Sequence, residues 1–244
     1  MKERTQLHVS IDLRDPLPAT AEEIAEPEYR KPSAMVDSSD EAVIELAHRV
    51  DAFLIEEGLT LPPRGEPLNP EAQMHVAYAL RDLVHAHISD KHLSTAYASA
   101  SETARTGSGD CTEHAVLLAA VLKARGIPAR VCHGLVYVEQ GGSAISGEAE
   151  EEVGDDAERT GQFGWHMWSQ AMINGMWMDM DATLHVPYSV GHVLVGTSSM
   201  SDKEAHNNHM QMAALIGNLE MVLLSVSHDW DAPSPRHEKT HDEL

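Results

Sequence analysis

A cysteine, Cys111, stands at the start of a well-marked helix in the sequence GDCTEHAVLLAAVLKARGIPAR. Asp110 can accept hydrogen bonds from the free backbone N–H groups of the first turn, and Glu113 completes a capping box. The helix dipole places about half a positive charge at this end, which favours the thiolate over the thiol. Because the thiolate is the reactive form of cysteine, the pattern predicts a nucleophile.

A histidine and an aspartate that could serve this thiol occur later, in WHMWSQAMINGMWMDMD. The Asn-Gly pair at 174–175 lies between two apolar runs and predicts a two-residue hairpin turn. That turn pairs Trp168 with Asp181, so His166, Trp168 and Asp181 are expected on one face. His166 and Asp181 become diagonal neighbours, about 7–8 Å apart at the backbone, and their side chains can span this gap. A slip of one residue would separate them. In the predicted register, Asp181 orients the imidazole and His166 faces Cys111.

These motifs, in this order, resemble the transglutaminase-like superfamily of papain-type cysteine enzymes, and in particular a stand-alone, bacterial-type member. The resemblance is carried by GDCTEHAVLLAAVLKARGIPAR, WHMW and NGMWMDMDAT, over roughly residues 75–185. It implies that Cys111, His166 and Asp181 are the catalytic cysteine, histidine and aspartate, and that the core is papain-like. Ala182 stands where the family commonly has a proline, and nothing resembles the extra β-domains or calcium loops of the large crosslinking transglutaminases. Both departures favour hydrolysis of the acyl-enzyme over protein crosslinking.

Hydrophobic periodicity along the rest of the chain predicts an α+β fold, in which N-terminal helices and the nucleophile helix pack on an antiparallel sheet. We expect an N-terminal strand and extended segment at 1–38, a catalytic domain at 39–228 and a polar tail at 229–244. The further expected elements are helices at about 40–57, 70–88 and 203–216 and strands at 7–13, 129–138, 186–195 and 219–226.

An acidic loop at 139–161 joins the strand after the nucleophile helix to the histidine strand. Its high charge predicts a solvated loop, and a lid or specificity loop is the alternative. Acyl transfer also requires donors for an oxyanion, and the backbone N–H of Cys111 is the first candidate. Tyr97 is a candidate substrate-binding or oxyanion residue, with ordinary packing as its alternative. Trp168 is the second candidate substrate-binding or oxyanion residue, and it is expected to form a wall beside the imidazole, or else to pack in the core.

The composition excludes several classes of function. A formal charge of −22, with 39 acidic and 17 basic residues, argues against nucleic acids and anionic membrane surfaces. Two cysteines make no disulfide framework, and Cys132 is expected to pack as a small hydrophobe. We expect no membrane span and no signal peptide, and therefore a cytoplasmic protein. The C-terminal HDEL matches an endoplasmic-reticulum retention signal, which we interpret as coincidental.

The chain has 16 histidines, which invite a metal interpretation. The pairs His85/His87 and His206/His209 lack partners at ligand spacing, so we expect no metal and no cofactor. The expected function is cysteine-dependent hydrolysis of amide bonds in a peptide or protein. Two alternatives stay open: a protein-glutamine γ-glutamyltransferase (transglutaminase), in which an amine replaces water, and a non-catalytic peptide-binding module.

Overall fold

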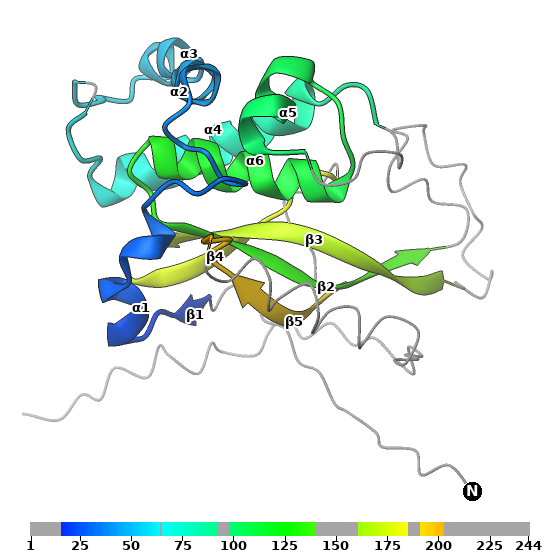
Figure 1. Cartoon of the computed structure of the whole chain (residues 1–244). Helices are drawn as coiled ribbons and strands as arrows, with labels where there is room; N and C mark the ends of the chain where they lie inside the picture. The colour runs from blue at the N-terminus through cyan, green and yellow to red at the C-terminus, as the bar shows by residue number, and fades with distance from the viewer. Residues whose placement is uncertain (1–15, 64, 92–97, 140–160, 185–190, 203–244) are drawn as a thin grey trace, which may run out of the picture.

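The computed structural model describes residues 16–63, 65–91, 98–139, 161–184 and 191–202. In this part of the chain, a five-stranded antiparallel sheet of order β1-β4-β3-β2-β5 lies beneath a layer of helices (Figure 1). The strands are β1 (Leu17–Pro18), β2 (Ala129–Glu139), β3 (Gly161–Ile173), β4 (Met176–Met180) and β5 (His192–Ser198). The helices are α1 (Ala21–Ala25), the 3-10 turn η1 (Pro27–Tyr29), α2 (Glu41–His48), α3 (Asp51–Glu56), α4 (Pro70–His87), α5 (Ala100–Thr106) and α6 (Cys111–Ala124). This arrangement confirms the predicted α+β class.

Helix α6 begins and ends where the sequence predicts. Asp110 caps its start and forms the expected capping box with Glu113. At the other end, Gly126 adopts a left-handed conformation with φ of 75°, and the N–H of Ile127 donates to the carbonyl of Leu122 at 3.0 Å. Every residue from 113 to 123 is buried, so the helix is enclosed by the other helices and the sheet, and its first residue is held in place.

The hairpin β3–β4 also forms in the predicted register. Asn174 and Gly175 both have positive φ, and Ile173 pairs with Met176 across the turn. The ladder ends at the pair Ser169–Met180, so the strand pairs predicted beyond it are not formed. The chain turns there instead, because the carboxylate of Asp181 accepts hydrogen bonds from backbone N–H groups just after it.

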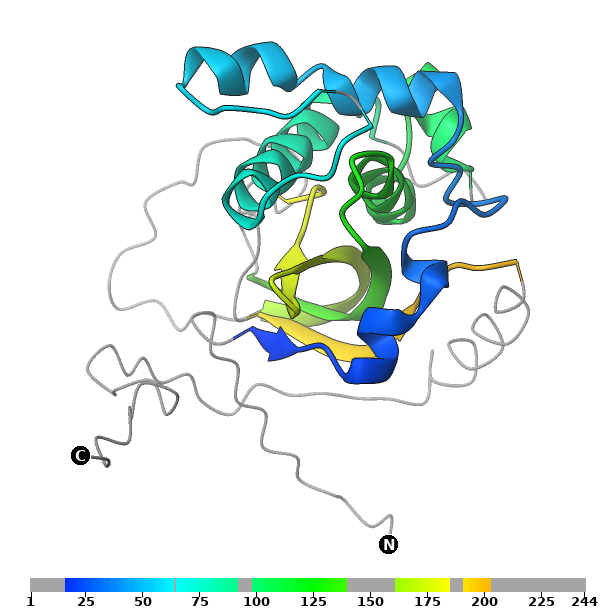
Figure 2. The ribbon, with the colours of Figure 1, turned by 90° about the vertical axis from the view of Figure 1, so that its left-hand side faces the viewer.

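The sheet is strongly curled, so that β4 and β5 approach each other although they flank opposite sides of the β3–β2 pair (Figure 2). Gly134 in β2 permits a close approach of β5 to β2. A Cβ atom there would lie 2.1 Å from the carbonyl oxygen of Val193 in β5 and 3.0 Å from the ring of Trp168 in β3. Beside this position, His166 of β3, His192 of β5 and Asp181, which follows β4, form one buried cluster.

The predicted single helix at 40–57 is two helices, α2 and α3. No proline or glycine marks the break, which explains why the periodicity did not reveal it. Arg125, at the end of α6, donates to the carbonyl of Ala47 at 3.1 Å and forms an ion pair with Asp51. In a continuous helix, the carbonyl of Ala47 would accept from the N–H of Asp51. Here it accepts from the buried guanidinium of Arg125 instead.

Other expected elements differ at their edges. The segment predicted as extended contains β1, α1 and η1, where α1 is held by a capping box between Thr20 and Glu23. The helix at 70–88 is confirmed as α4, and the strand expected at 186–195 appears as β5, a few residues later. The ranges 7–13, 140–160, 203–216, 219–226 and 229–244 lie outside the described residues. No helix in the described ranges is long and apolar enough to cross a membrane.

Candidate active site

Cys111 is the first residue of α6, half-buried and with a free thiol. The first turn around it is fixed by two carboxylates. Asp110 accepts from the N–H of Thr112 at 2.8 Å, and buried Glu113 accepts from the N–H of Asp110 at 2.9 Å and from that of Ala98 at 3.0 Å. Glu113 therefore ties the segment before α5 to the start of α6. No described residue accepts a hydrogen bond from the N–H of Cys111, which keeps that donor eligible for an oxyanion.

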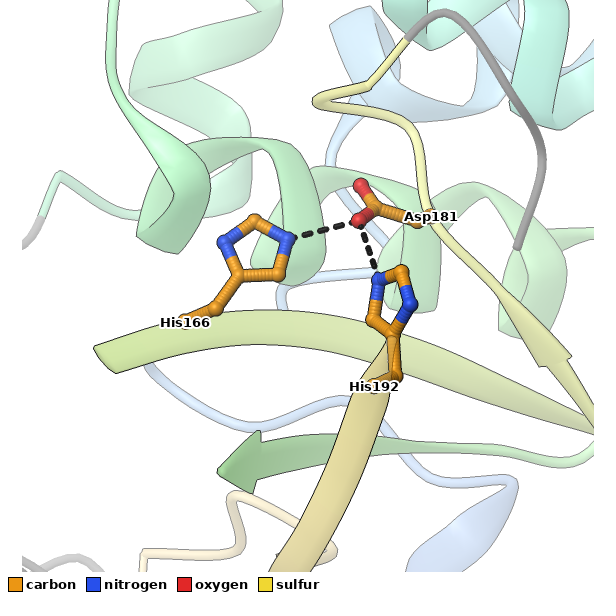
Figure 3. Close-up of side chains that lie close together, drawn as sticks. All are labelled: His166, Asp181 and His192. Atoms are coloured by element: carbon orange, nitrogen blue, oxygen red, sulfur yellow. Dashed lines mark hydrogen bonds and ion pairs between the residues drawn. The ribbon is translucent and has the colours of Figure 1, made fainter. Parts of the chain in front are cut away.

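His166 and Asp181 meet as the sequence predicted, although Asp181 lies just beyond the end of β4. The Nε2 atom of His166 is 2.6 Å from Oδ2 of Asp181, and both side chains are buried (Figure 3). An ionised carboxylate can only accept, so the proton of this hydrogen bond is on Nε2 of the imidazole. The other ring nitrogen, Nδ1, is then the one available to a thiol.

His166 responds to both of its neighbours. Burial alone would lower its pKa, but the hydrogen bonds and charges of Asp181 and Cys111 outweigh this and raise the pKa to about 9. Asp181 and Cys111 are thus both among the groups that raise the pKa of His166. An imidazole with this pKa is protonated at neutral pH, which suits it to share a proton with a neighbouring thiol.

Asp181 is completely buried and ionised. Burial would raise its pKa, but hydrogen bonds from His166 and from His192 in β5 hold it well below its usual range. Its second oxygen, Oδ1, accepts from the N–H groups of Thr183 at 2.7 Å and Leu184 at 3.3 Å. Both carboxylate oxygens are therefore fixed by donors.

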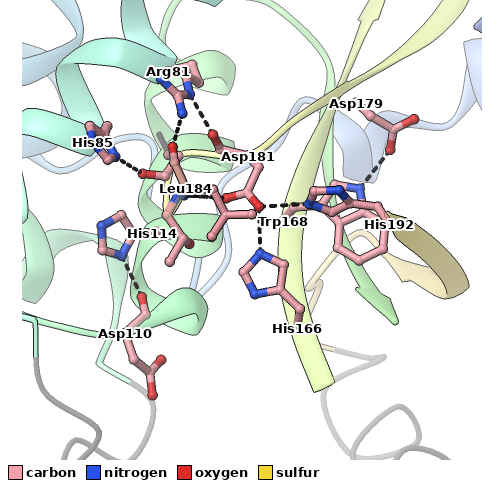
Figure 4. Close-up of polar contacts among 12 residues, drawn as sticks. Arg81, His85, Asp110, His114, His166, Trp168, Asp179, Asp181, Leu184 and His192 are labelled. Atoms are coloured by element: carbon pink, nitrogen blue, oxygen red, sulfur yellow. Dashed lines mark hydrogen bonds and ion pairs between the residues drawn. The ribbon is translucent and has the colours of Figure 1, made fainter. Parts of the chain in front are cut away.

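Three side chains hold the backbone of the turn at 181–184: Arg81 and His85 of α4, which Figure 4 shows, and Lys91, which follows that helix. Arg81 is buried and donates to the carbonyls of Asp181 and Leu184. His85 lies 2.9 Å from the carbonyl of Ala182, and Lys91 donates to the carbonyl of the next residue at 3.4 Å. The periodicity placed these residues on or just after a helix but gave no sign that they support Asp181.

Trp168 packs beside the imidazole of His166, as expected, with the two rings stacked at 6.2 Å. It is almost fully buried, and its indole N–H donates to Asp179 at 2.7 Å. Gln170 also donates to Asp179. Because its only donor is engaged, the indole holds the site together from within, and an oxyanion role does not fit this geometry. Tyr97, the other candidate of this kind, lies outside the described residues.

His114, one turn into α6, is buried and points its Nδ1 at the carbonyl of Asp110, 2.6 Å away. Burial is the main cause that lowers its pKa to about 4, so this imidazole is neutral at physiological pH. At neutral pH, His114 is therefore neutral and His166 is protonated. Of these two histidines, only His166 can then act as an acid.

The sequence analysis missed His192, which completes a group of two histidines and one carboxylate. Its Nε2 atom lies 2.9 Å from the same Oδ2 of Asp181. These residue types can bind a metal ion, and the three ligand atoms lie within 4.8 Å of one another. However, ligands around a tetrahedral zinc are about 3.3 Å apart, given bonds of about 2.0–2.1 Å. The separations of 2.6 and 2.9 Å fit two hydrogen bonds on one oxygen.

Comparisons with known proteins agree with the sequence motifs. Residues 65–182 match the family model of the transglutaminase-like superfamily. A candidate cysteine protease from Cytophaga hutchinsonii is 19% identical, with a TM-score of 0.47, over 78% of this chain and 53% of that one. Red sea bream transglutaminase is 15% identical, with a TM-score of 0.38, over 66% of this chain and 28% of that one.

The periplasmic domain of TgpA from Pseudomonas aeruginosa, bound to ethylmercury, is 21% identical, with a TM-score of 0.26, over 56% of this chain and 50% of that one. This chain therefore spans about half or less of the length of these three solved structures. Among curated proteins, no sequence matches it.

Proposed function

The chain belongs to the transglutaminase-like superfamily, and from this premise we propose that it catalyses cysteine-dependent acyl transfer on amide bonds of peptides or proteins. In this proposal Cys111 is the nucleophile, His166 the acid and base, and Asp181 the group that orients His166. The observation that carries it is the buried pair of His166 and Asp181, joined at 2.6 Å, with Cys111 among the groups that raise the pKa of the imidazole.

In the first half-reaction, the Cys111 thiolate attacks the carbonyl carbon of the amide. The backbone N–H of Cys111 is positioned to donate to the resulting oxyanion. His166, protonated at neutral pH because its pKa is about 9, gives the proton on Nδ1 to the leaving amine as the carbon–nitrogen bond breaks. A thioester on Cys111 and a neutral His166 result.

In the second half-reaction, His166 takes a proton from the acceptor through Nδ1 while the acceptor oxygen or nitrogen attacks the thioester carbon. The carbon–sulfur bond breaks and restores the thiolate beside a protonated imidazole. We propose that the acceptor is water, so that the product is a carboxylic acid and the enzyme a protease or amidase. A primary amine in place of water would make it a transglutaminase.

The acceptor is tested by incubating the full chain with a glutamine-containing peptide pool and a labelled primary amine, and measuring product masses. Backbone cleavage or glutamine deamidation is the expected result, and amine incorporation would replace hydrolysis with transfer. Cys111→Ala serves as the inactive control, and Cys132→Ala as the matched control that retains activity.

The proposal fails if no product forms at any pH between 6 and 9 while the protein binds peptides from the same pool. That result would favour a binding module. The pH dependence offers an independent check: because imidazolium is the acid in the first step, turnover should decline as the pH rises through about 9.

A further inference from the structure

His192 contacts the candidate active site from the far edge of the sheet. Strand β5 pairs only with β2 in the described part of the chain, yet the Nε2 atom of His192 lies 2.9 Å from Oδ2 of Asp181, which follows β4 (Figure 3). The side chain is completely buried, and so is that of Asp181. A buried polar contact between such distant strands fixes the geometry of both partners.

Both imidazoles donate to one oxygen. Because the carboxylate of Asp181 is ionised, the Nε2 atoms of His166 and His192 must each carry a proton. With Oδ1 held by the N–H groups of Thr183 and Leu184, four donors surround the carboxylate. If His192 did not donate, Oδ2 would be held by His166 alone, and only the two N–H groups on Oδ1 would limit rotation of the carboxylate.

A β-bulge puts His192 on the correct face. In β2, Gly134 pairs with His166 of β3, so these two residues point to the same side of the sheet. The register between β2 and β5 shifts by one residue after His133, which leaves Val195 as the extra residue, and Val136 then pairs with His192. Val136 shares the face of Gly134, and so does His192. Without the bulge, His192 would point to the opposite face.

The ring of His192 is itself oriented by packing. It meets the indole of Trp168 edge-on at 5.2 Å, and the indole is held in turn by its hydrogen bond to Asp179. The rings of His192 and His166 are 5.7 Å apart and tilted. A rigid chain of contacts thus runs from Asp179 through Trp168 and His192 to the carboxylate of Asp181.

We propose that His192 is a positioning residue of this site: its Nε2–H holds the carboxylate of Asp181 in place, and Asp181 in turn keeps Nδ1 of His166 aimed at Cys111. This inference rests on the proposed function, because it assigns a purpose to that alignment. His192 itself does not contact Cys111 through any described hydrogen bond, and it acts only through Asp181.

Three variants of the full chain test the proposal, with alkylation of Cys111 by iodoacetamide at neutral pH as the probe. His192→Leu removes the donor and should slow alkylation about tenfold, because a misaligned imidazole supports the thiolate poorly. His192→Gln places an amide donor near the same point and should restore the rate to within about twofold. His133→Leu removes a histidine of β2 that packs on Gly196 of β5, and should leave the rate unchanged.

A spectroscopic signal separates positioning from general loosening of the fold. The proton on Nε2 of His166 should give a resolved downfield NMR line in the wild type and in His192→Gln, and this line should shift or broaden in His192→Leu. If His192→Leu does not fold, His192→Asn, whose amide is too short to reach Asp181, takes its place.

Alkylation at the wild-type rate with an unmoved His166 line in the Leu or Asn variant would overturn the proposal, and so would failure of His192→Gln to restore either signal. Neither readout requires a substrate. Failure of the proposed function would instead appear as absence of acyl transfer in the wild type, so the two results are distinguishable.

Discussion

Cys111 and Cys132 are carried by consecutive elements of the same fold, one at the first residue of α6 and the other in the middle of β2. Cys111 is half-buried, at the positive end of a helix dipole, and is one of the groups that raise the pKa of His166. Cys132 is completely buried opposite Trp168, and burial raises its pKa well above the ordinary value. The two thiols therefore lie in different surroundings, and burial disfavours the thiolate of Cys132.

The difference shows how secondary structure contributes to the surroundings of each thiol. A helix start exposes unpaired N–H groups beside its first side chain, and a central strand uses its N–H groups in the ladder. Neighbouring charges add to this difference: Cys111 is among the groups that raise the pKa of His166, and the carboxylate of Asp179 raises the pKa of Cys132. Reactivity follows from these surroundings.

The largest expected effect comes from replacing each cysteine with alanine, which removes the thiol. Cys111→Ala should lower the rate of acyl transfer at least about a thousandfold, because the nucleophile is removed, with little change in stability. Cys132→Ala should leave the rate within about twofold. Product formation measured by mass spectrometry checks both. Residual turnover by Cys111→Ala at a tenth of the wild-type rate would contradict the assignment of different roles to Cys111 and Cys132.

Burial and neighbouring groups also shift the pKa values of two buried histidines, His166 and His114, in opposite directions. The pKa of His166 is raised to about 9, so its contribution to stability is present below about pH 6.5 and is lost as the pH rises toward 9. The pKa of His114 is lowered to about 4, mainly by burial, so stability falls as the pH drops from about 6.5 toward 4. Stability should peak near pH 6.5.

Urea unfolding across this range measures both limbs, each of which should amount to no more than about 3 kcal/mol. His114→Gln should flatten the acidic limb and leave the alkaline limb unchanged. A stability curve that is flat from pH 4 to 9, or an acidic limb that survives this substitution, would show that the two imidazoles are not held in opposite states.

A smaller effect is expected when each thiol becomes a hydroxyl. Cys132→Ser buries a polar group among apolar neighbours and should destabilise the fold by about 1–3 kcal/mol. Cys111→Ser places the hydroxyl at a half-buried helix start and should change stability by less than about 0.5 kcal/mol. Thermal or urea unfolding of the two variants compares them directly, and equal losses would contradict the contrast in packing.

Local patterns were sufficient to predict α6, the hairpin at 174–175 and the contact between His166 and Asp181. The capping box and the Asn-Gly turn each act within a few residues, and the turn sets the register of the hairpin as far as the pair Ser169–Met180. The break between α2 and α3 could not be predicted, because its cause is Arg125, far along the chain.

The support around Asp181 was missed for a similar reason. His192 reaches the carboxylate only because a bulge at Val195 sets its face, and a single added residue in a strand leaves no mark on hydrophobic alternation. Arg81 lies in a helix that was predicted correctly, but its burial depends on the turn at 181–184 that it holds. Both are long-range contacts, which sequence periodicity does not encode.

The most direct test of the central claim is timed alkylation of the wild type with iodoacetamide at neutral pH, with each site quantified by peptide mass. Cys111 should be modified at least about tenfold faster than Cys132, and His166→Ala should remove most of that advantage. Equal rates, faster modification of Cys132, or a Cys111 rate that does not respond to loss of His166 would contradict the assignment of Cys111 as the activated nucleophile.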